Sequence, residues 1–344
     1  YSMKISNKSI GNNFQCFIIA EGCDNHMGDL EVAREMSLRA KLSGADAIKF
    51  QHHLPDEEML KNIHLSDNFE EPLYDFLLKN ALKIDDHIAL KSFCDEIGII
   101  YLCTPFSYKA ACELMDLDVP CFKIGSGEMT DIPSLKKIAD LGKPMILSTG
   151  MSTIEEIKLT YNELKALDVE FALLNCVSEY PPVYEDVNLG FIPKMYDLFP
   201  NVVIGHSDHT PDIYTCFGAV TLGAKIIEKH VIIDKRTPGP DQSVSIDFTD
   251  LKQLVDGVRK IEASLGAEKI IHDKEKQIRE WAFRSVVAVR NIPEGQKITE
   301  DDLWTKRPGT GIPSKEMPKI IGCIAKRDIQ QNTLLTYSDY EKKN

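Results

Sequence analysis

Eight short apolar runs along the first 230 residues constrain the fold of this chain more than any other feature. The runs read FIIAE, AIKFQ, IIYLCTPF, CFKIGSGE, PMILSTG, FALLNCVSEY, VVIGHSDH and AKIIEKH. Helix-length stretches lie between them, and in 30–42 and 153–167 apolar residues recur every three or four positions. Strand and helix alternating eight times predict an α/β fold, the (β/α)8 or TIM barrel, whose active site lies at the carboxyl ends of the strands.

Composition narrows the class of protein. The chain has 344 residues, 43% of them hydrophobic, which suffices for a sizeable core and about two domains. Its net charge of -13 argues against nonspecific binding to nucleic acid or acidic membranes, so an anionic substrate needs local cations to recruit it. No apolar run approaches the roughly 20 residues of a membrane span, and no charged-then-apolar leader precedes the first strand. The nine cysteines form no CxxC pair, so we expect a cytoplasmic protein with reduced thiols.

The pattern of the chain changes after the last barrel helix, which we expect at 250–265. The charged segment 267–280 has the composition of an exposed linker helix, and short β-like pieces with Pro/Gly turns follow it. We therefore predict a barrel over 1–266, a linker over 267–283 and a small domain over 284–344. A domain of this size has a thin core, so it should pack on the barrel or on a partner subunit. Before the first strand, 4–15 fit a hairpin that closes the bottom of the barrel.

His209 and His230 end consecutive barrel strands, which makes their side chains neighbours at the rim. Two neutral imidazoles with open positions beside them can bind a divalent ion that still accepts a substrate oxygen. An oxygen-rich remainder favours Mn2+ or Mg2+ over a closed zinc site. His206 points to the opposite face by strand alternation and is interpreted as packing. For His52 and His53 the plainer interpretation, an exposed or hydrogen-bonded histidine, is favoured.

Lys49 and Lys123 lie inside apolar strands, where a charge is costly without a partner. Either lysine alone fits a structural ion pair. Together with hydroxyls at other strand ends they predict instead a cradle for a phosphate or carboxylate. These hydroxyls belong to Thr104, Ser126, Ser148 and Ser207.

Glu21 and Glu128 complete the rim as candidate acid or base groups, although each can equally position a hydroxyl or a lysine. GSGEMT at 125–130 lacks the third glycine of a dinucleotide loop, so a nucleotide cofactor is not expected. PGPD at 238–241 forms a turn that ends in Asp241. That carboxylate either only closes the turn or binds a substrate hydroxyl.

Taken together, the motifs resemble the sialic acid synthase family. IKFQ, CTPF, KIGSGE, ILSTGM, SDHT, EKH, PGPD, FRSVV and KRPG occur in this order across the chain. The resemblance implies a barrel followed by a small domain similar to type III antifreeze protein. It also implies condensation of phosphoenolpyruvate with an open-chain N-acetylmannosamine-type aldehyde and release of phosphate by cleavage of the carbon–oxygen bond.

The resemblance assigns roles residue by residue. His209 and His230 would bind a divalent metal, Mn2+ or alternatively Mg2+ or Co2+, and Glu21, Lys123 and Glu128 would be catalytic. Phosphoenolpyruvate would be bound by Lys49, Thr104, Lys123, Ser126, Ser148, Ser178 and Ser207. The sugar would be bound by Gln51, Phe106, Tyr180, Asp241, Phe283 and Arg307. Arg307 is similar to an arginine that the small domain inserts over the partner's barrel, which implies a domain-swapped homodimer.

Three positions depart from the family's pattern. Cys23 stands where glycine is usual, Asp24 where an apolar residue is usual, and Ser178 where asparagine is usual. These changes leave the choice open between N-acetylmannosamine, its 6-phosphate and 2,4-diacetamido-2,4,6-trideoxymannose. The stretch EKHVIIDKRTPGPD is more similar to the branch that makes legionaminate.

Three rival hypotheses follow from the same residues. The first is a Schiff-base aldolase of the neuraminate-lyase type that uses Lys123. The second is a metal-dependent amidohydrolase, for which the HxH pattern after the first strand is missing. The third is a binding protein in which the small domain does the work.

Overall fold

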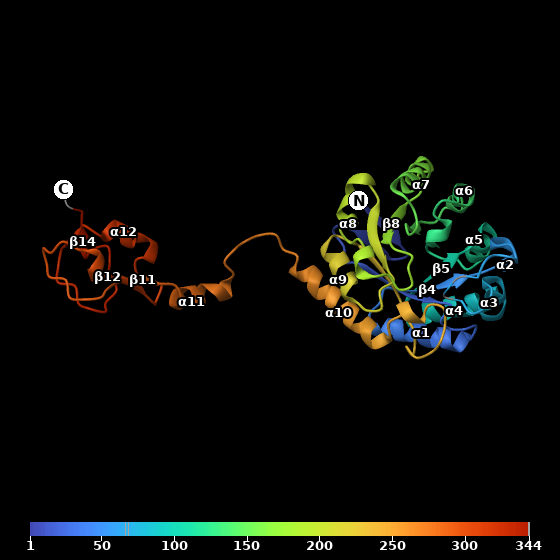
Figure 1. The fold of residues 1–344 in the computed structure, drawn as a ribbon, viewed down its shortest axis with the longest axis horizontal. Coiled ribbons are helices and arrows are strands. Elements are labelled where there is room, and N and C mark those ends of the chain that lie inside the picture. Colours follow the sequence, from blue (N-terminus) through green and yellow to red (C-terminus); the bar gives the residue numbers. More distant parts are fainter. Residues whose placement is uncertain (66, 68, 343–344) are drawn as a thin grey trace. The chain divides into compact units, whose positions relative to one another are not determined.

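Eight parallel strands close into a barrel in the order in which they occur in the chain, which confirms the predicted (β/α)8 fold (Figure 1). The computed structural model describes residues 1–65, 67 and 69–342. The barrel strands are β3 (Phe17–Cys23), β4 (Ala47–His52), β5 (Ile100–Pro105), β6 (Phe122–Ile124), β7 (Met145–Ser148), β8 (Phe171–Cys176), β9 (Val203–Asp208) and β10 (Ile226–His230). Pairing of β10 with β3, from Ile226 opposite Phe17 to His230 opposite Glu21, closes the barrel.

Helices surround the barrel and bury their apolar faces against the outward side chains of the strands (Figure 1). They are α1 (Leu30–Ser43), α4 (Ile84–Ile97), α5 (Tyr108–Asp116), α6 (Ile132–Ala139), α7 (Ile154–Ala166), α8 (Phe191–Leu198), α9 (Tyr214–Thr221) and α10 (Phe248–Ser264). Two further helices, α2 (Pro55–Glu58) and α3 (Leu73–Asn80), follow β4 and contribute no side chain to this cluster. The sequence determines their ends locally. In α1 the side chain of Asp29 accepts hydrogen bonds from the first turn, and Gly44 ends the helix in the left-handed conformation.

The inside of the barrel is apolar at one end and polar at the other. Inward side chains such as Phe17, Ile19 and Ile226 pack with Met3 and Ile10 in one buried cluster. Met3 and Ile10 belong to the antiparallel hairpin of β1 (Ser2–Ile5) and β2 (Lys8–Gly11), so the predicted hairpin at the bottom of the barrel is confirmed. On most strands the inward positions toward the carboxyl end are polar, such as Glu21, Lys49 and Thr104, because side chains on one face recur every second residue. The fold thereby places these polar groups at the carboxyl ends of the strands.

The chain divides into two compact units, Tyr1–Gly266 and Ala267–Asn344. The second unit contains α11 (Asp273–Ala282), β11 (Ser285–Ala288), β12 (Leu303–Lys306), α12 (Met317–Ile320), β13 (Ile324–Ala325) and β14 (Tyr340–Glu341). Its core is small and is formed by buried side chains such as Val286, Ile298 and Leu335. The finer division into a linker and a domain from residue 284 stays a prediction. Within the described ranges, no helix has both the length and the apolar character needed to cross a membrane.

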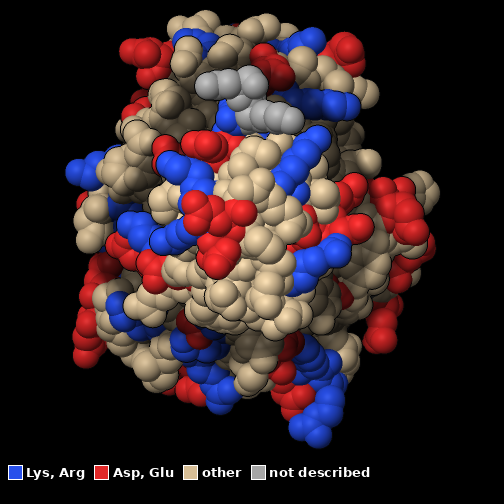
Figure 2. Space-filling model, turned by 90° about the vertical axis from the view of Figure 1, so that its left-hand side faces the viewer, with Lys and Arg blue, Asp and Glu red and all other residues tan. Residues whose placement is uncertain are grey.

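Acidic and basic side chains are interspersed on the face that Figure 2 shows. Salt screens exposed charges of either sign over about 8–10 Å at physiological ionic strength.

Candidate active site

A cavity of about 480 Å³ opens at the carboxyl ends of the barrel strands. Every predicted site residue that belongs to the barrel lines it. These residues are Glu21, Lys49, Gln51, Thr104, Phe106, Lys123, Ser126, Glu128, Ser148, Ser178, Tyr180, Ser207, His209, His230 and Asp241. The two other predicted residues, Phe283 and Arg307, lie in the second unit. The structure thus brings the polar strand endings together, while their individual roles stay predictions.

Two buried lysines supply the positive charge of the cavity. Lys49 on β4 and Lys123 on β6 are 2% and 3% exposed. The Nζ of Lys49 donates to Thr104 Oγ1 at 3.0 Å, and the Nζ of Lys123 donates to Ser148 Oγ at 2.7 Å. Each lysine is therefore held beside a hydroxyl that points into the same space. Ammonium and hydroxyl groups in this arrangement are donors suited to a phosphate or carboxylate.

Glu228 on β10 connects the two lysines. Its Oε2 lies 3.7 Å from the Nζ of Lys49, and its Oε1 lies 3.5 Å from the Nζ of Lys123. Ser207 donates a hydrogen bond to the same carboxylate at 2.9 Å. Glu21 forms a second ion pair with Lys49. Structural pairing and an anion cradle thus coexist. Burial lowers the pKa of Lys49 to about 8, and the nearby carboxylate of Glu228 opposes this shift.

Glu228 is ionised despite its burial. Burial raises the pKa of its carboxyl group, but Lys123 and Lys49 more than offset burial and hold the pKa well below its ordinary value. The sequence prediction missed this residue. The sequence does contain a feature that could have identified it. Glu228 is a charged residue inside the apolar run AKIIEKH, just as Lys49 and Lys123 are charged residues inside other apolar runs.

The turn after β7 brings a backbone N–H to the hydroxyl of Ser126. The N–H of Gly150 donates to Ser126 Oγ at 3.0 Å. A Cβ at Gly150 would lie 2.6 Å from that oxygen and 2.1 Å from Ser178 Oγ, so only glycine fits here. The turn therefore holds two of the predicted anion-binding hydroxyls close to one backbone donor.

His209 and His230 form an adjacent pair of rings beside Tyr180. Their ring centroids are 5.1 Å apart, and the Tyr180 ring lies 4.5 Å from His209. The Nδ1 of His209 bonds to the carbonyl of Val177 at 2.8 Å, which leaves Nε2 as its ligand atom. Burial and the neighbouring His209 hold the pKa of His230 well below its ordinary value. His230 is therefore neutral, the form in which an imidazole binds a cation.

The two candidate catalytic carboxylates differ in their surroundings. Glu21 is fully engaged, since its Oε1 accepts a hydrogen bond from the backbone N–H of Cys23 at 2.6 Å while its Oε2 pairs with Lys49. Glu128 has a buried Oε2 without a hydrogen-bond partner among the described residues. Burial raises the pKa of Glu128 to about 7, although Lys123 opposes this effect. Of the two, Glu128 is the group suited to exchange a proton near neutral pH.

His53 occupies the cavity wall between two carboxylates, a position that the sequence prediction missed. Its Nδ1 lies 2.7 Å from Glu58, and its Nε2 lies 2.9 Å from Gln51 Oε1 and 3.4 Å from Asp24. Its ring stacks on Phe106 at 4.2 Å. Burial lowers the pKa of His53, but Asp24 and Glu58 more than offset burial and raise it to about 9. The charged ring fixes the Gln51 amide oxygen, so the amide nitrogen is left to face a ligand.

His206 and His52 make hydrogen bonds within the barrel domain and do not line the cavity. The expected packing role of His206 agrees with its contacts, since its Nε2 lies 2.9 Å from Asp208 and its Nδ1 lies 3.3 Å from Asn175. Asp208 also accepts a hydrogen bond from Lys229 at 2.7 Å on the side of the strands that faces the helices. His52 is buried and lies 2.6 Å from Glu113.

Phe283 and Arg307 lie near each other in the second unit. The Nε of Arg307 donates to the carbonyl of Ala282 at 3.1 Å, and its guanidinium lies 5.4 Å from the ring of Trp281. The guanidinium of Arg279 lies 4.3 Å from the ring of Phe283. Both rings are more than half exposed. These residues form an exposed aromatic and cationic surface in the second unit.

Comparison with known proteins identifies the family. A model of the NeuB family matches residues 37–270, which is more than half of the chain. The chain belongs to the NeuB family. A model of the SAF domain matches residues 283–341, in the second unit. The predicted resemblance to the sialic acid synthases is thereby confirmed.

Named members of the NeuB family are similar over nearly the whole chain. The N,N'-diacetyllegionaminic acid synthase of Legionella pneumophila is 36% identical and covers 97% of this chain and 97% of its own length. The N-acetylneuraminate-9-phosphate synthase of Homo sapiens is 36% identical and covers 91% of this chain and 89% of its own. Among solved structures, the N-acetylneuraminic acid synthetase of Leptospira borgpetersenii in complex with citrate matches with a TM-score of 0.74 and 32% identity. That match covers 81% of this chain and 95% of the other.

Proposed function

We propose that this NeuB-family chain is a nonulosonate synthase. It would condense phosphoenolpyruvate with the open-chain aldehyde of an N-acylated mannose-type sugar and release phosphate. The observation that carries the proposal is the pairing, in one cavity, of two lysines among hydroxyls with two adjacent histidines. The names of the Legionella and human relatives support the same reaction class.

Phosphoenolpyruvate would bind against Lys49 and Lys123. The hydroxyls beside these lysines and the N–H of Gly150 add donors from the ends of two strands, β5 and β7. Since Glu228 already compensates part of the lysine charge, the site binds a polyanion without leaving an unpaired cation when it is empty of substrate. Preorganised donors of this kind also stabilise the negative charge that builds up as phosphate leaves.

His209 and His230 would hold the divalent metal. The residues fit such an ion, because His230 is neutral and its buried Nδ1 has no hydrogen-bond partner among the described residues, while His209 presents Nε2. The cation would polarise the aldehyde oxygen of the sugar. We propose Mn2+, Mg2+ or Co2+ as its identity.

In the proposed order of bond changes, Glu128 carries out a proton transfer. Carbon 3 of phosphoenolpyruvate attacks the aldehyde carbon, and water adds to the cationic carbon 2. Glu128 takes a proton from that water, for which its pKa of about 7 is well matched. That proton passes to the alkoxide formed from the aldehyde. The tetrahedral adduct then breaks its carbon–oxygen bond to phosphate and becomes the ketone, its hydroxyl proton goes to the departing phosphate, and Lys123 and Lys49 stabilise that anion.

The sugar would occupy the side of the cavity lined by Gln51, Phe106, Tyr180 and Asp241. Phe106 is held by stacking on His53 and offers an apolar surface to the ring carbons of the substrate. We expect 2,4-diacetamido-2,4,6-trideoxymannose to be the best acceptor, because the stretch around Asp241 favours the legionaminate branch. N-Acetylmannosamine is the alternative.

We also propose a domain-swapped homodimer in the cytoplasm, in which Phe283 and Arg307 of one copy cover the cavity of the other. The exposed aromatic and cationic surface of the second unit supports this arrangement, and the nine free thiols support a reducing compartment. Arg307→Ala and His209→Ala proteins should each be inactive alone. After unfolding and refolding together they should regain activity, because one site in each mixed dimer is then complete. Refolded mixtures that stay inactive would contradict the swap.

The direct assay measures phosphate release from phosphoenolpyruvate with a panel of sugars. The panel contains mannosamine, N-acetylmannosamine, its 6-phosphate and the 2,4-diacetamido-trideoxy sugar. Release should require both an N-acylated sugar and Mn2+. Release with none of the sugars would refute the proposed function.

The contacts of Lys123 argue against the Schiff-base alternative. Its Nζ donates hydrogen bonds to Ser148 Oγ and the carbonyl of Ile124 and lies 3.5 Å from Glu228, so the nitrogen is engaged by three acceptors. A Schiff base requires the neutral amine as nucleophile. Borohydride treatment in the presence of substrate should therefore leave the mass of the protein unchanged. A trapped adduct on Lys123, together with activity in chelator, would favour the aldolase.

A further inference from the structure

The end of strand β3 is irregular, and the irregularity turns Cys23 toward His230. In the pairing with β4, Glu21 lies opposite Lys49 and Cys23 opposite Phe50, so Gly22 is an extra residue in a β-bulge. A Cβ at Gly22 would lie 2.6 Å from the ring of Phe50, so glycine is required there. Cys23 itself has a φ of 43°, in the left-handed region. A bulge of this kind redirects the side chain that follows it.

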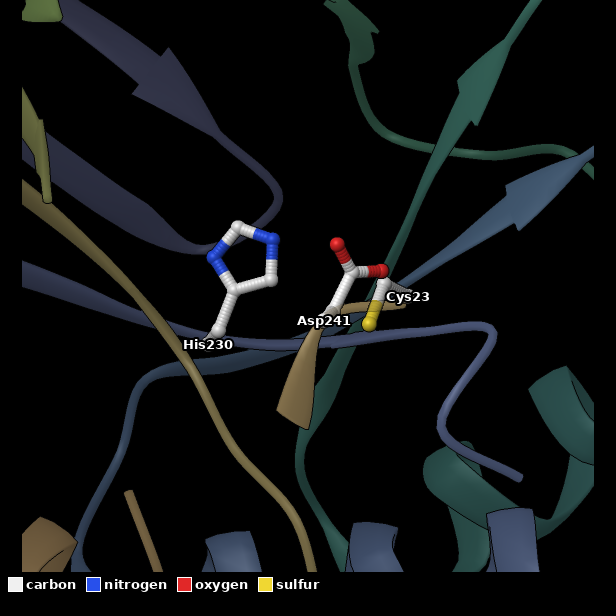
Figure 3. Close-up of side chains that lie close together, drawn as sticks. All are labelled: Cys23, His230 and Asp241. Atoms are coloured by element: carbon white, nitrogen blue, oxygen red, sulfur yellow. The ribbon is translucent and has the colours of Figure 1, made fainter. Parts of the chain in front are cut away.

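Three different donor groups meet at this point. One ligand atom each of Cys23, His230 and Asp241 lies within 4.8 Å of the other two. Figure 3 shows the carboxylate of Asp241 between the imidazole and the thiol. Among the described residues, Cys23, His230 and Asp241 are the one group of three His, Cys, Asp or Glu side chains with ligand atoms this close together. Donors bound to one ion at about 2.0–2.3 Å lie up to about 4.6 Å apart, so small side-chain movements suffice to bind it.

His230 is the imidazole of this group, and its side chain is more than nine-tenths buried. In Figure 3 its Nε2 is on the side of the ring that faces Asp241 and Cys23. A cation between His230, Cys23 and Asp241 would bind to that nitrogen. The buried Nδ1, on the other side of the ring, has no hydrogen-bond partner in the described part of the chain, so no protein group competes for the orientation of the ring from that side. The same cation is within reach of His209, whose ring lies 5.1 Å from that of His230.

We infer that Cys23 and Asp241 are protein ligands of the metal held by His230, and that this chain's site is a mixed sulfur, nitrogen and oxygen site. The inference rests on the proposed function only in taking His230 as a metal ligand. A thiolate is softer than a carboxylate or water, so it shifts the preference toward Zn2+ or Co2+ and away from Mg2+. On binding, the sulfur–hydrogen bond breaks, the sulfur–metal bond forms, and the proton leaves to solvent.

Cobalt gives a readout that does not depend on turnover. Metal-free full-length protein titrated with Co2+ should develop thiolate-to-cobalt charge-transfer absorption that saturates at one ion per chain. Cys23→Gly and Cys23→Ser should abolish this absorption. Cys23→Gly keeps the fold, because glycine accepts the left-handed conformation without strain.

Two other thiols serve as matched controls. Cys176 is the competing candidate, since its Sγ lies 3.8 Å from His209, and Cys112 lies on α5 far along the chain from the site. Cys176→Ser and Cys112→Ser should both keep the absorption. The inference is overturned if Cys23→Gly keeps it, if Cys176→Ser loses it, or if the unmodified protein never shows it.

Metal preference gives a second measurement. In competition with a chromophoric chelator, Cys23→Gly should weaken Zn2+ binding by about tenfold or more and Mn2+ binding by much less. Equal weakening of both ions would contradict a sulfur ligand. Turnover separates this inference from the proposed function. An unmodified protein that turns over without the cobalt absorption refutes only the sulfur ligand, and one with the absorption but no turnover with any sugar refutes only the synthase.

Discussion

The cavity has two sides that are built differently. The lysine side consists of Lys49, Thr104, Lys123, Ser148, Ser207 and Glu228, and all of these residues lie on barrel strands. The thiol side consists of Asp24, His53 and Asp241, which line the cavity, and of the buried Cys23 next to Asp241. These four residues lie at a bulge or in loops. On the lysine side each charge is paired across short distances within the barrel sheet. On the thiol side, the charged His53 pairs with Asp24, and the neighbouring backbone is strained at Cys23, which has a positive φ.

This difference corresponds to the two substrates of the proposed reaction. The lysine side would bind phosphoenolpyruvate, and rigid strands hold such a site to a fixed geometry. The thiol side would meet the sugar and the metal, and its loops tolerate changes of sequence more readily than strands do. The departures from the family's pattern at Cys23 and Asp24 both fall on the thiol side.

Removing Glu228 should have the largest effect on stability. Glu228→Gln leaves the ammonium groups of Lys49 and Lys123 buried near each other without the carboxylate that links them. Breaking such a buried pair typically lowers the free energy of unfolding by about 3–5 kcal/mol. Urea denaturation measures the change. Glu163→Gln, which breaks a partly exposed pair with Lys136, is the control and should lose less than about 1 kcal/mol. Equal losses in both variants would contradict the linking role of Glu228.

Replacing Glu128 should slow turnover by about 100-fold or more if it is the proton acceptor. Because its pKa is about 7, the unmodified enzyme should speed up as the pH rises through 7, as the carboxyl group ionises. Glu128→Gln should remove that rise. The kcat/KM of both proteins, measured between pH 5 and 9, tests this because it reports groups of the free enzyme. A rise that persists in the variant would assign the proton transfer to another group.

His53 should make the stability of the protein fall at alkaline pH. Its pKa of about 9 when folded exceeds the usual value of about 6.5. The stabilisation by Asp24 and Glu58 is therefore complete below about pH 6.5 and is lost as the pH rises through 9. The full loss is roughly 3 kcal/mol, since one pKa unit corresponds to about 1.4 kcal/mol. Denaturation at pH 6 and 9.5 should show this difference, and His53→Gln should reduce it. His64→Gln, at an exposed position, should leave it unchanged.

Cys23→Gly should have the smallest effect on the metal-free protein, an increase in stability of up to about 1 kcal/mol. Glycine relieves the left-handed strain at φ 43°, which offsets the greater flexibility it gives the unfolded chain. The same replacement at Cys103, inside β5, should lower stability because it leaves only a cavity there. Thermal unfolding of both variants compares the two sides directly. A clear loss of stability at Cys23 would contradict strain at the bulge.

The barrel was predictable because period-two alternation and helical spacing are local signals. Phe17, Ile19 and Glu21 show the rule, since every second residue of the run points into the barrel and the last of them is polar. Alternation also predicts that Glu228, two residues before His230, points into the barrel. A charged residue inside an apolar run was the signal that identified the two lysines, and Glu228 shows the same signal. Glu228 was missed because that signal was applied to cations only.

The thiol side was less predictable for a physical reason. His53, Asp24 and Glu58 meet across a loop and a short helix, where no periodicity fixes the direction of a side chain. The approach of Cys23 to Asp241 depends on the bulge at Gly22, which changes the register by one residue. The sequence identified Cys23 as unusual, and only the three-dimensional arrangement shows which groups it meets.

The central claim is that the lysine side and the thiol side act together on phosphoenolpyruvate and a sugar in one synthase cavity. Phosphoenolpyruvate labelled with oxygen-18 in the bridge between carbon 2 and phosphorus tests it most directly, with mass spectrometry of the phosphate released. The account predicts that phosphate carries the label and appears only when an N-acylated mannose-type sugar is present. Unlabelled phosphate, or release that does not depend on the sugar, would contradict it.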